Sequence, residues 1–400
     1  MVHGCMSQFL FLTIVLPYLS FRYICSQDNL MEIHLSYIIE DLPWWQLTLL
    51  GTVCAFIVTY LSIPAIVSVS KRLQLFEKTK SRGSHVGSVP TLGGVAIFAG
   101  FLMVGGILMP DSLIGHYRFV VAALVILFFI GVRDDLMGMD HRRKLIGQLL
   151  VAFIITVLGD LRISSFHGIF LFIEEVPYLV SVPFTVFVYI VIINGFNLID
   201  GIDGLASGIA IVVSLAFGAL FIVSGDYDLA FVPLMLTGSL LAFFRFNVFS
   251  KKNKIFFGDT GSMTIGLIIA VITIQFLECD QIGKGSFVIN SSPALAFGIL
   301  IVPLFDTVRV FLIRYLRGKS PFSADRLHIH HRLLDMGFSH LTSSLLIMAA
   351  NLLIIAVILL LRNIEGLDLV VIIFFMAAFL SYIPIYLVDR RKDKADAQNK

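Results

Sequence analysis

The chain has 400 residues, of which 58% are hydrophobic and only 14% charged, and its mean hydropathy is +0.94. Soluble domains average about 25% charged residues, so these values exclude a soluble globular protein and indicate a polytopic membrane protein. The net charge of +2 gives no indication of a nucleic-acid partner, and none is expected.

Residues 1–40 precede the first strong apolar span. Their short apolar run, Phe9 to Tyr23, lacks the basic region and the cleavage site of a signal peptide. Met31 begins a sequence that leads directly into the first span. A start codon placed too far upstream and a real extra segment are therefore both open.

Eleven apolar runs follow, each of roughly 16 to 26 residues, the length needed to cross about 30 Å of hydrocarbon as a helix. They lie near 46–70, 91–109, 117–132, 145–159, 182–199, 205–224, 229–247, 262–278, 293–316, 342–361 and 368–388. The sequence thus predicts an all-α transmembrane domain over residues 41–390, with kinks at Pro64 and Pro303. A polar tail, 391–400, follows and is expected to be disordered.

The distribution of basic residues predicts the orientation. Of the 29 Lys and Arg residues, 24 fall in the C-terminal parts of odd-numbered spans, in the loops that follow these spans or in the C-terminal tail. The positive-inside rule places these loops and the C-terminus in the cytoplasm. Every cluster of acids, amides and histidines that indicates chemistry falls on this same face.

The first cluster follows the third span and contains Asp134, Asp135, Asp140 and, shortly after, Lys144. Adjacent carboxylates repel each other, so they favour a bound divalent cation, and hard oxygen donors suit Mg²⁺ or Mn²⁺. A solvated loop neutralised by neighbouring arginines is the alternative. Earlier in the chain, a Gly- and Pro-rich entry to the second span, 87–94, fits close helix packing nearly as well as ligand contact.

The most unusual stretch is Ile193 to Leu205, which combines two amides, two carboxylates and three glycines at the end of an apolar run. Its polar residues are Asn194, Asn197, Asp200 and Asp203. No Lys or Arg neutralises them within the stretch, so a metal or polar-ligand site is favoured over a simple helix cap.

A third motif, Phe256 to Ser262, opens the eighth span and carries Asp259 in a Gly-Asp-Thr-Gly-Ser sequence. A helix N-terminus of this kind favours phosphate or a phosphate-bound metal. An ordinary capping role for Asp259 is the alternative.

A fourth motif follows the ninth span, where His328, His330 and His331 stand among basic residues. Zinc would require a fourth ligand, and no cysteine is near. The histidines are more typical of donors to a polyphosphate, with a solvated charged segment as the alternative.

These four motifs, in this order on an eleven-span chain, resemble the polyprenyl-phosphate N-acetylhexosamine-1-phosphate transferases. The spacing of His328, His330 and His331 resembles the N-acetylglucosamine 1-phosphate branch of that family rather than the peptidoglycan branch. The resemblance covers residues 41–390. It implies transfer of GlcNAc 1-phosphate from UDP-GlcNAc to undecaprenyl phosphate at the cytoplasmic face of the bacterial inner membrane, which starts a surface glycan such as O-antigen or a teichoic-acid-like polymer. It is also compatible with a homodimer.

The resemblance also implies roles for individual residues. Asp259 would coordinate Mg²⁺, with Mn²⁺ as a substitute, helped by Asp135 and Asn197. Asp134 would deprotonate or orient the lipid phosphate. The remaining residues would contact the nucleotide sugar: Asn194, Lys144, Asp200, Asp203 near the uracil, Phe256 stacked on it, and His328, His330 and His331 at the diphosphate. Asp140 departs from the family pattern and is not expected to be functional.

Two alternatives differ in substrate or class. The donor could be another UDP-N-acetylhexosamine or UDP-MurNAc-pentapeptide, because a few hydrogen bonds decide sugar specificity. An ion-coupled transporter would also place carboxylates in a many-span protein. Transporters, however, generally hold them near the membrane midplane in repeated halves, and this chain shows neither feature. The acid deepest in a predicted span, Asp306, is expected to pair with Arg309.

Overall fold

The computed structural model describes residues 42–75, 89–166, 175–279, 291–318 and 327–398. Segment 1–40 lies outside these described residues, as does Met31. The described part of the chain is helical, and apart from one isolated bridge between Ser165 and Glu175 it contains no β-structure. The predicted all-α class is therefore confirmed.

Each of the eleven predicted spans falls on helix. The helices are α3 (Trp44–Arg72), α4 (Gly93–Leu108), α5 (Asp111–Met137), α6 (His141–Phe153, extended by a π-helical turn Ile154–Leu158), α7 (Tyr178–Ile199), α8 (Leu205–Ser224), α9 (Tyr227–Phe249), α10 (Gly258–Leu277), α11 (Ser292–Ile299), α12 (Ile301–Leu316), α13 (Ile329–Asp335), α14 (His340–Leu360) and α15 (Gly366–Gln398).

Seven of these helices are long and apolar enough to cross a membrane: α3, α7, α8, α9, α10, α14 and the first 23 residues of α15. The pair α11 and α12 raises the number to eight if it is one broken span. The 16-residue α4 is apolar but shorter. A multi-pass membrane protein is thus supported, whereas the count of eleven crossings stays a prediction.

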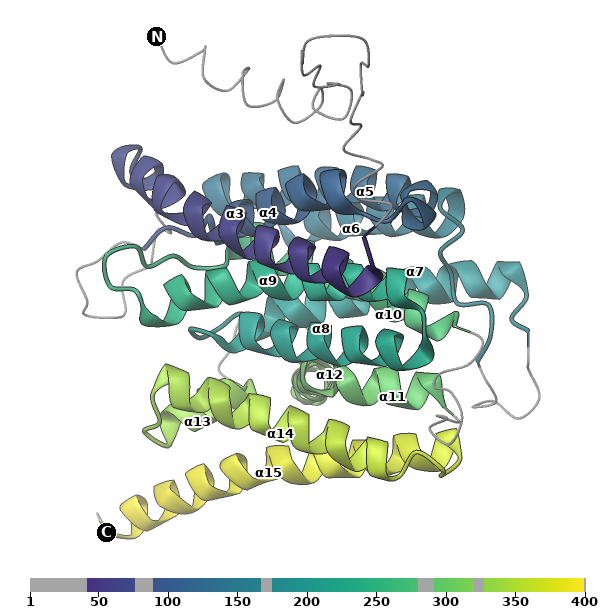
Figure 1. The fold of residues 1–400 in the computed structure, drawn as a ribbon. Helices are drawn as coiled ribbons and strands as arrows, with labels where there is room; N and C mark the ends of the chain where they lie inside the picture. Colours follow the sequence, from purple (N-terminus) through teal and green to yellow (C-terminus); the bar gives the residue numbers. More distant parts are fainter. Residues whose placement is uncertain (1–41, 76–88, 167–174, 280–290, 319–326, 399–400) are drawn as a thin grey trace, which may run out of the picture.

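Helix α10 forms the centre of the bundle (Figure 1). Helices α4, α5, α7, α8, α9 and α11 all pack against it, and its apolar stretch is completely buried. Close approach depends on glycines: a Cβ on Gly94 would overlap the backbone of Gly261, and a Cβ on Gly131 would lie 2.5 Å from the Cα of Thr260. The Gly-rich entry to α4 therefore packs against the first turn of α10, as the packing alternative predicts.

The ninth span is broken between α11 and α12, whose axes differ by 74°. In Figure 1, α11 runs across the picture and α12 is seen nearly end-on. Pro303 lies in the first turn of α12, where a missing N–H costs no hydrogen bond. The predicted bend of the ninth span is therefore confirmed, but the break lies at Leu300, before Pro303. Helix α3 runs through Pro64 as one helix.

The polar tail is the clearest correction to the expected fold. Residues 391–398 continue α15 as helix, so the expectation of a disordered tail is wrong as far as Gln398. Lys, Arg, Ala and Gln are good helix formers, and the preceding span supplies the nucleus from which the helix extends.

Consecutive helices alternate in direction, so one end of the bundle collects the C-termini of α3, α5, α7 and α9 and the N-termini of α4, α8, α10 and α14. A pocket at this end is lined by residues from all of these termini or from the turns beside them. The first three motifs predicted to carry chemistry meet here. That this end faces the cytoplasm stays a prediction.

Candidate active site

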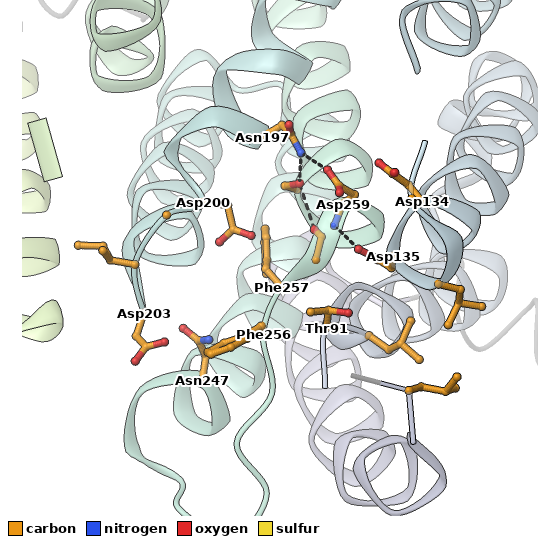
Figure 2. A pocket seen from close by; sticks show the side chains of 18 of the residues that line it. Thr91, Asp134, Asp135, Asn197, Asp200, Asp203, Asn247, Phe256, Phe257 and Asp259 are labelled. Atoms are coloured by element: carbon orange, nitrogen blue, oxygen red, sulfur yellow. Dashed lines mark hydrogen bonds between the residues drawn. The ribbon is translucent and has the colours of Figure 1, made fainter. Parts of the chain in front are cut away.

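The pocket has a volume of about 800 Å³ and opens at the end of the bundle (Figure 2). This volume lies within the usual range of small-molecule sites. Figure 2 shows Asp134, Asp135 and Asp259 gathered at one end and Asp203 with Phe256 at the other. The pocket therefore has two polar ends.

Asp135 caps the helix that begins with the third motif. Its Oδ1 accepts the backbone N–H of Asp259 at 2.7 Å, and its Oδ2 accepts the N–H of Thr260 at 3.0 Å and the Thr260 hydroxyl at 2.5 Å. A carboxylate is favourable at a helix N-terminus. Burial raises the pKa of the Asp135 carboxyl to about 7, although the hydrogen bonds from Thr260 act in the opposite direction. Both oxygens are thus committed to fixing the start of α10.

Lys144 of α6 stands between two carboxylates. Its Nζ forms an ion pair with Asp134 and lies 3.0 Å from Oδ1 of Asp259. The same Oδ1 accepts a hydrogen bond from Asn197 Nδ2 at 2.6 Å, and Asn197 also donates to Ser262 Oγ at 2.9 Å. Asp134 is almost completely buried. We call Asp134, Lys144 and Asp259 the acidic cluster; it joins α5, α6 and α10.

The carboxylates of the acidic cluster are candidate magnesium ligands. Among the described residues, no group of three or more His, Cys, Asp or Glu side chains is arranged to hold a metal ion. Mg²⁺, however, usually takes one or two carboxylates and completes its shell with water and substrate phosphate. Asp134 and Asp259 both pair with the ammonium group of Lys144, so these two carboxylates lie close enough to share a cation and fit this requirement. Asp135 fits it less well, because α10 occupies both its oxygens.

Asp203 and Lys254 form the other end of the pocket. Lys254 Nζ lies 2.6 Å from Asp203 Oδ2 and 5.7 Å from the centre of the Phe256 ring. His340 of α14 approaches the same carboxylate at 3.4 Å. Burial by itself would raise the pKa of Asp203, but the hydrogen bonds and charges of His340 and Lys254 outweigh it and lower that pKa below 3.8. An ionised acid and an aromatic ring thus lie side by side.

Asp200 and Asn194 were both predicted to contact the nucleotide sugar, but only one of them lines the pocket. Asp200 ends α7 and lines the pocket between its two ends (Figure 2). Asn194 is not among the lining residues. Its Nδ2 donates to Gln148 Oε1 of α6 at 2.7 Å, and Gln148 Nε2 returns a weaker bond at 3.4 Å. The structure therefore makes Asn194 a link between α6 and α7 and does not bring it to the pocket.

The histidine motif lies behind the pocket wall. His328 and His330 are buried, with 5% and 2% of their surfaces exposed, and His331 is half-buried. None of them lines the pocket. A Cβ on Gly201 would overlap the His330 ring, so the motif packs directly against the turn that follows α7. Burial lowers the pKa of His330 to about 3, so its ring is neutral near pH 7.

Several pocket residues were not singled out from the sequence. Asn247 and His340 line the pocket, and Lys254 pairs with Asp203. Thr91, in the Gly- and Pro-rich entry 87–94, also lines the pocket, as the ligand-contact alternative for that segment predicts. The Asn247 amide accepts the N–H of Gly204 at 2.7 Å and donates to the carbonyl of Ile255 at 2.9 Å. A polar residue near the end of an apolar span was the available signal for Asn247. His340 and Lys254 looked like ordinary loop residues.

The fold and the pocket define the class: a multi-pass membrane protein with a paired-carboxylate site at one end of its helix bundle. Residues 117–277 match the family model described as Glycosyl transferase family 4.

Curated relatives extend this match over most of the chain. An undecaprenyl-phosphate alpha-N-acetylglucosaminyl 1-phosphate transferase of Escherichia coli is 32% identical over 330 residues, covering 82% of this chain and 88% of its own. A Salmonella typhi protein of the same name is 31% identical, covering 74% and 78%. A decaprenyl-phosphate N-acetylglucosaminephosphotransferase of Mycobacterium tuberculosis is 31% identical, covering 76% and 80%. The chain belongs to glycosyl transferase family 4 and is a polyprenyl-phosphate sugar-1-phosphate transferase by family.

Proposed function

We propose that this protein transfers N-acetylglucosamine 1-phosphate from UDP-GlcNAc to undecaprenyl phosphate, giving GlcNAc-diphospho-undecaprenol and UMP. The observation that carries the proposal is the acidic cluster, in which Asp134 and Asp259 both line the pocket of an apolar bundle and both pair with the Lys144 ammonium group. The names of the matched relatives support the same donor sugar and the same type of acceptor.

In this reaction an oxygen of the lipid phosphate attacks the sugar-bearing phosphorus of UDP-GlcNAc, and the bond from that phosphorus to UMP breaks. When bound, Mg²⁺ would neutralise charge on the diphosphate and on the departing UMP. Asp259 and Asp134 are the carboxylates placed to hold it. Asn197 orients Asp259 by its hydrogen bond to Oδ1.

Asp134 also orients the lipid phosphate and takes its proton if one is present. Lys144 supplies positive charge between the two carboxylates, which lets one anionic phosphate approach another. Asp135 contributes by fixing the first turn of α10, because both its oxygens bind that turn.

The opposite end of the pocket is assigned to the nucleotide. Phe256 stacks on the uracil, Asp203 accepts a hydrogen bond from it, and Asp200 lies along the path between the base and the acidic cluster. None of the three histidines lines the pocket, so we assign none of them a direct contact with the nucleotide. The apolar surface of the bundle lets the lipid acceptor approach within the bilayer.

The location follows from the charge distribution. We assign the protein to the bacterial inner membrane, with about eleven crossings and with the pocket and C-terminus in the cytoplasm, where UDP-sugars are made. The product would start a cell-surface polysaccharide.

The test is a donor comparison in membranes that contain the expressed protein. Undecaprenyl phosphate and Mg²⁺ are supplied with radiolabelled UDP-GlcNAc, another UDP-N-acetylhexosamine or UDP-MurNAc-pentapeptide, and label entering the organic phase is counted. Label from UDP-GlcNAc with equimolar UMP release is expected. Label from a different donor alone would overturn the assignment of the sugar.

A further inference from the structure

Asp306 is a buried carboxylate that the proposed reaction does not use. It lies in α12 with 3% of its surface exposed. Its Oδ1 accepts a bond from Arg309 Nη2 at 2.7 Å, which confirms the predicted pair, and another from the Ile329 N–H at 3.2 Å. Arg309 also donates to the carbonyl of Leu327 at 2.7 Å. Helix α12 thus holds the start of the histidine motif through both backbone and side chain.

The second oxygen of Asp306 binds a histidine. Asp306 Oδ2 lies 2.8 Å from Nδ1 of His328. A carboxylate is only an acceptor, so the bond requires a proton on Nδ1 of His328. One of the two ring nitrogens is therefore committed to Asp306, and both side chains are buried.

From His328 the contacts continue to the pocket. The rings of His328 and His330 stack with centres 5.6 Å apart, and the His330 ring packs against Gly201. Gly201 lines the pocket between Asp200 and Asp203. A change at Asp306 would reach the pocket wall through this row of rings.

Helix α12 also packs against α7 itself. Its Pro303 packs on Gly195 of α7, where a Cβ would come within 3.3 Å of the proline ring. Helix α12 therefore contacts α7 directly through Pro303, and it contacts the turn after α7 indirectly through the histidine rings.

From these contacts we infer that His328 and Asp306 are positioning residues that hold the Gly201 wall of the nucleotide subsite, and that His328 does not bind the diphosphate. The inference rests on the proposed function, because it concerns the subsite assigned to UDP-GlcNAc. It changes the role that the family resemblance implies for His328. The acidic cluster lies at the other end of the pocket and is left intact.

Two replacements of His328 separate the roles of its two nitrogens. Asn places its amide N–H where Nδ1 stands, so His328→Asn keeps the bond to Asp306. Gln places its amide where Nε2 stands, so His328→Gln loses that bond but keeps a polar group toward any ligand. The two side chains have the same chemistry and differ by one methylene group, so each is the control for the other.

Steady-state rates are measured for the full-length wild type, His328→Asn, His328→Gln and Asp306→Asn in membranes, with UDP-GlcNAc varied. We expect His328→Asn to stay within about threefold of wild type. We expect His328→Gln and Asp306→Asn to raise KM for UDP-GlcNAc by about tenfold or more, the scale of one hydrogen bond to a charged group, with kcat nearly unchanged.

Two results would overturn the inference. Greater activity in His328→Gln than in His328→Asn would mean that Nε2 acts on the substrate. Equal loss in both, carried by kcat, would mean that the intact imidazole takes part in the reaction.

A readout that does not use the reaction separates this inference from the proposed function. In detergent, the thermal unfolding temperature of His328→Asn should stay near the wild-type value, and that of His328→Gln should fall. The reverse order would contradict the Asp306 bond. A wild type inactive with every donor would sink the proposed function, while the order of unfolding temperatures would still decide the contact.

Discussion

The carboxylate of Asp135 holds the backbone of Asp259, whose N–H donates to Asp135 Oδ1 at 2.7 Å across 124 positions of sequence. The two acids therefore differ in task although both lie in the same site. Asp135 fixes the first turn of α10, and Asp259 faces Lys144 and Asn197.

Replacing Asp135 by Asn should lower kcat by at least about 100-fold, the scale seen when an electrostatic group of an active site is removed. The amide keeps the shape of the carboxylate but cannot accept on both sides, so the first turn of α10 shifts and moves Asp259. Initial rates at saturating UDP-GlcNAc provide the measurement.

The matched control for that change is Asp140→Asn. Asp140 is exposed and makes no side-chain capping bond at the start of α6, so its rate should stay within about threefold of wild type. Equal rates for the two variants would show that Asp135 has no special role.

Replacing Lys144 by Gln should lower stability in EDTA, because Asp134 and Asp259 then face each other without a neutralising charge. We expect a loss of about 1–3 kcal/mol, which added Mg²⁺ partly restores by binding both carboxylates. Thermal unfolding in detergent with EDTA and with Mg²⁺ measures both effects. The exposed neighbour Arg143 gives the control Arg143→Gln, which should show neither change. A Lys144→Gln protein as stable as wild type in EDTA would argue against the bridging role.

Acid should destabilise the protein through His330. Its pKa is 6.5 in an unfolded chain and about 3 in the fold, so between these values only the unfolded state gains a proton. Stability from this group is complete above pH 6.5 and is lost as the pH falls toward 3. The unfolding temperature should therefore drop between pH 7.5 and pH 5 by more in the wild type than in His330→Phe, which keeps a ring against Gly201. Identical pH profiles would mean that His330 is protonated or exposed in the folded protein.

The packing of α4 against α10 predicts that two Gly→Ala substitutions in α4 have opposite effects on stability. Gly94→Ala should destabilise the protein by about 1–3 kcal/mol, because the added methyl group overlaps the backbone of Gly261. Gly106→Ala, also in α4, meets no atom within 4 Å and should be neutral or slightly stabilising. Chemical or thermal unfolding of both variants tests the contrast. A harmless Gly94→Ala would show that α4 and α10 are farther apart than described.

The sequence predicted the helices well because hydrocarbon restricts the backbone conformations that a membrane-spanning segment can adopt. Backbone groups in hydrocarbon must be satisfied within a helix, so hydropathy alone located the helices, and the run 205–224 matches α8 to the residue. Local composition also located the paired acids and the break near Pro303.

The side-chain partners could not be predicted, because they join residues far apart in the chain. Nothing near Asp135 indicates that its oxygens cap a helix beginning at residue 258, and nothing near Asn194 points to Gln148. The histidines were a similar case. Their spacing indicated a polar ligand, whereas the structure buries His328 against Asp306 of the preceding helix. Such pairings depend on tertiary packing, which local pattern does not contain.

In the proposed mechanism, Asp134 and Asp259 hold Mg²⁺ for phosphoryl transfer to a lipid phosphate. The most direct measurement is organic-phase label from UDP-GlcNAc in purified membranes, with Mg²⁺ titrated after EDTA treatment, for the wild type and Asp259→Asn. We expect product that requires Mg²⁺ in the wild type and a rate at least about 100-fold lower in Asp259→Asn at every Mg²⁺ concentration. Product that forms in EDTA, or an Asp259→Asn protein as active as the wild type, would contradict it.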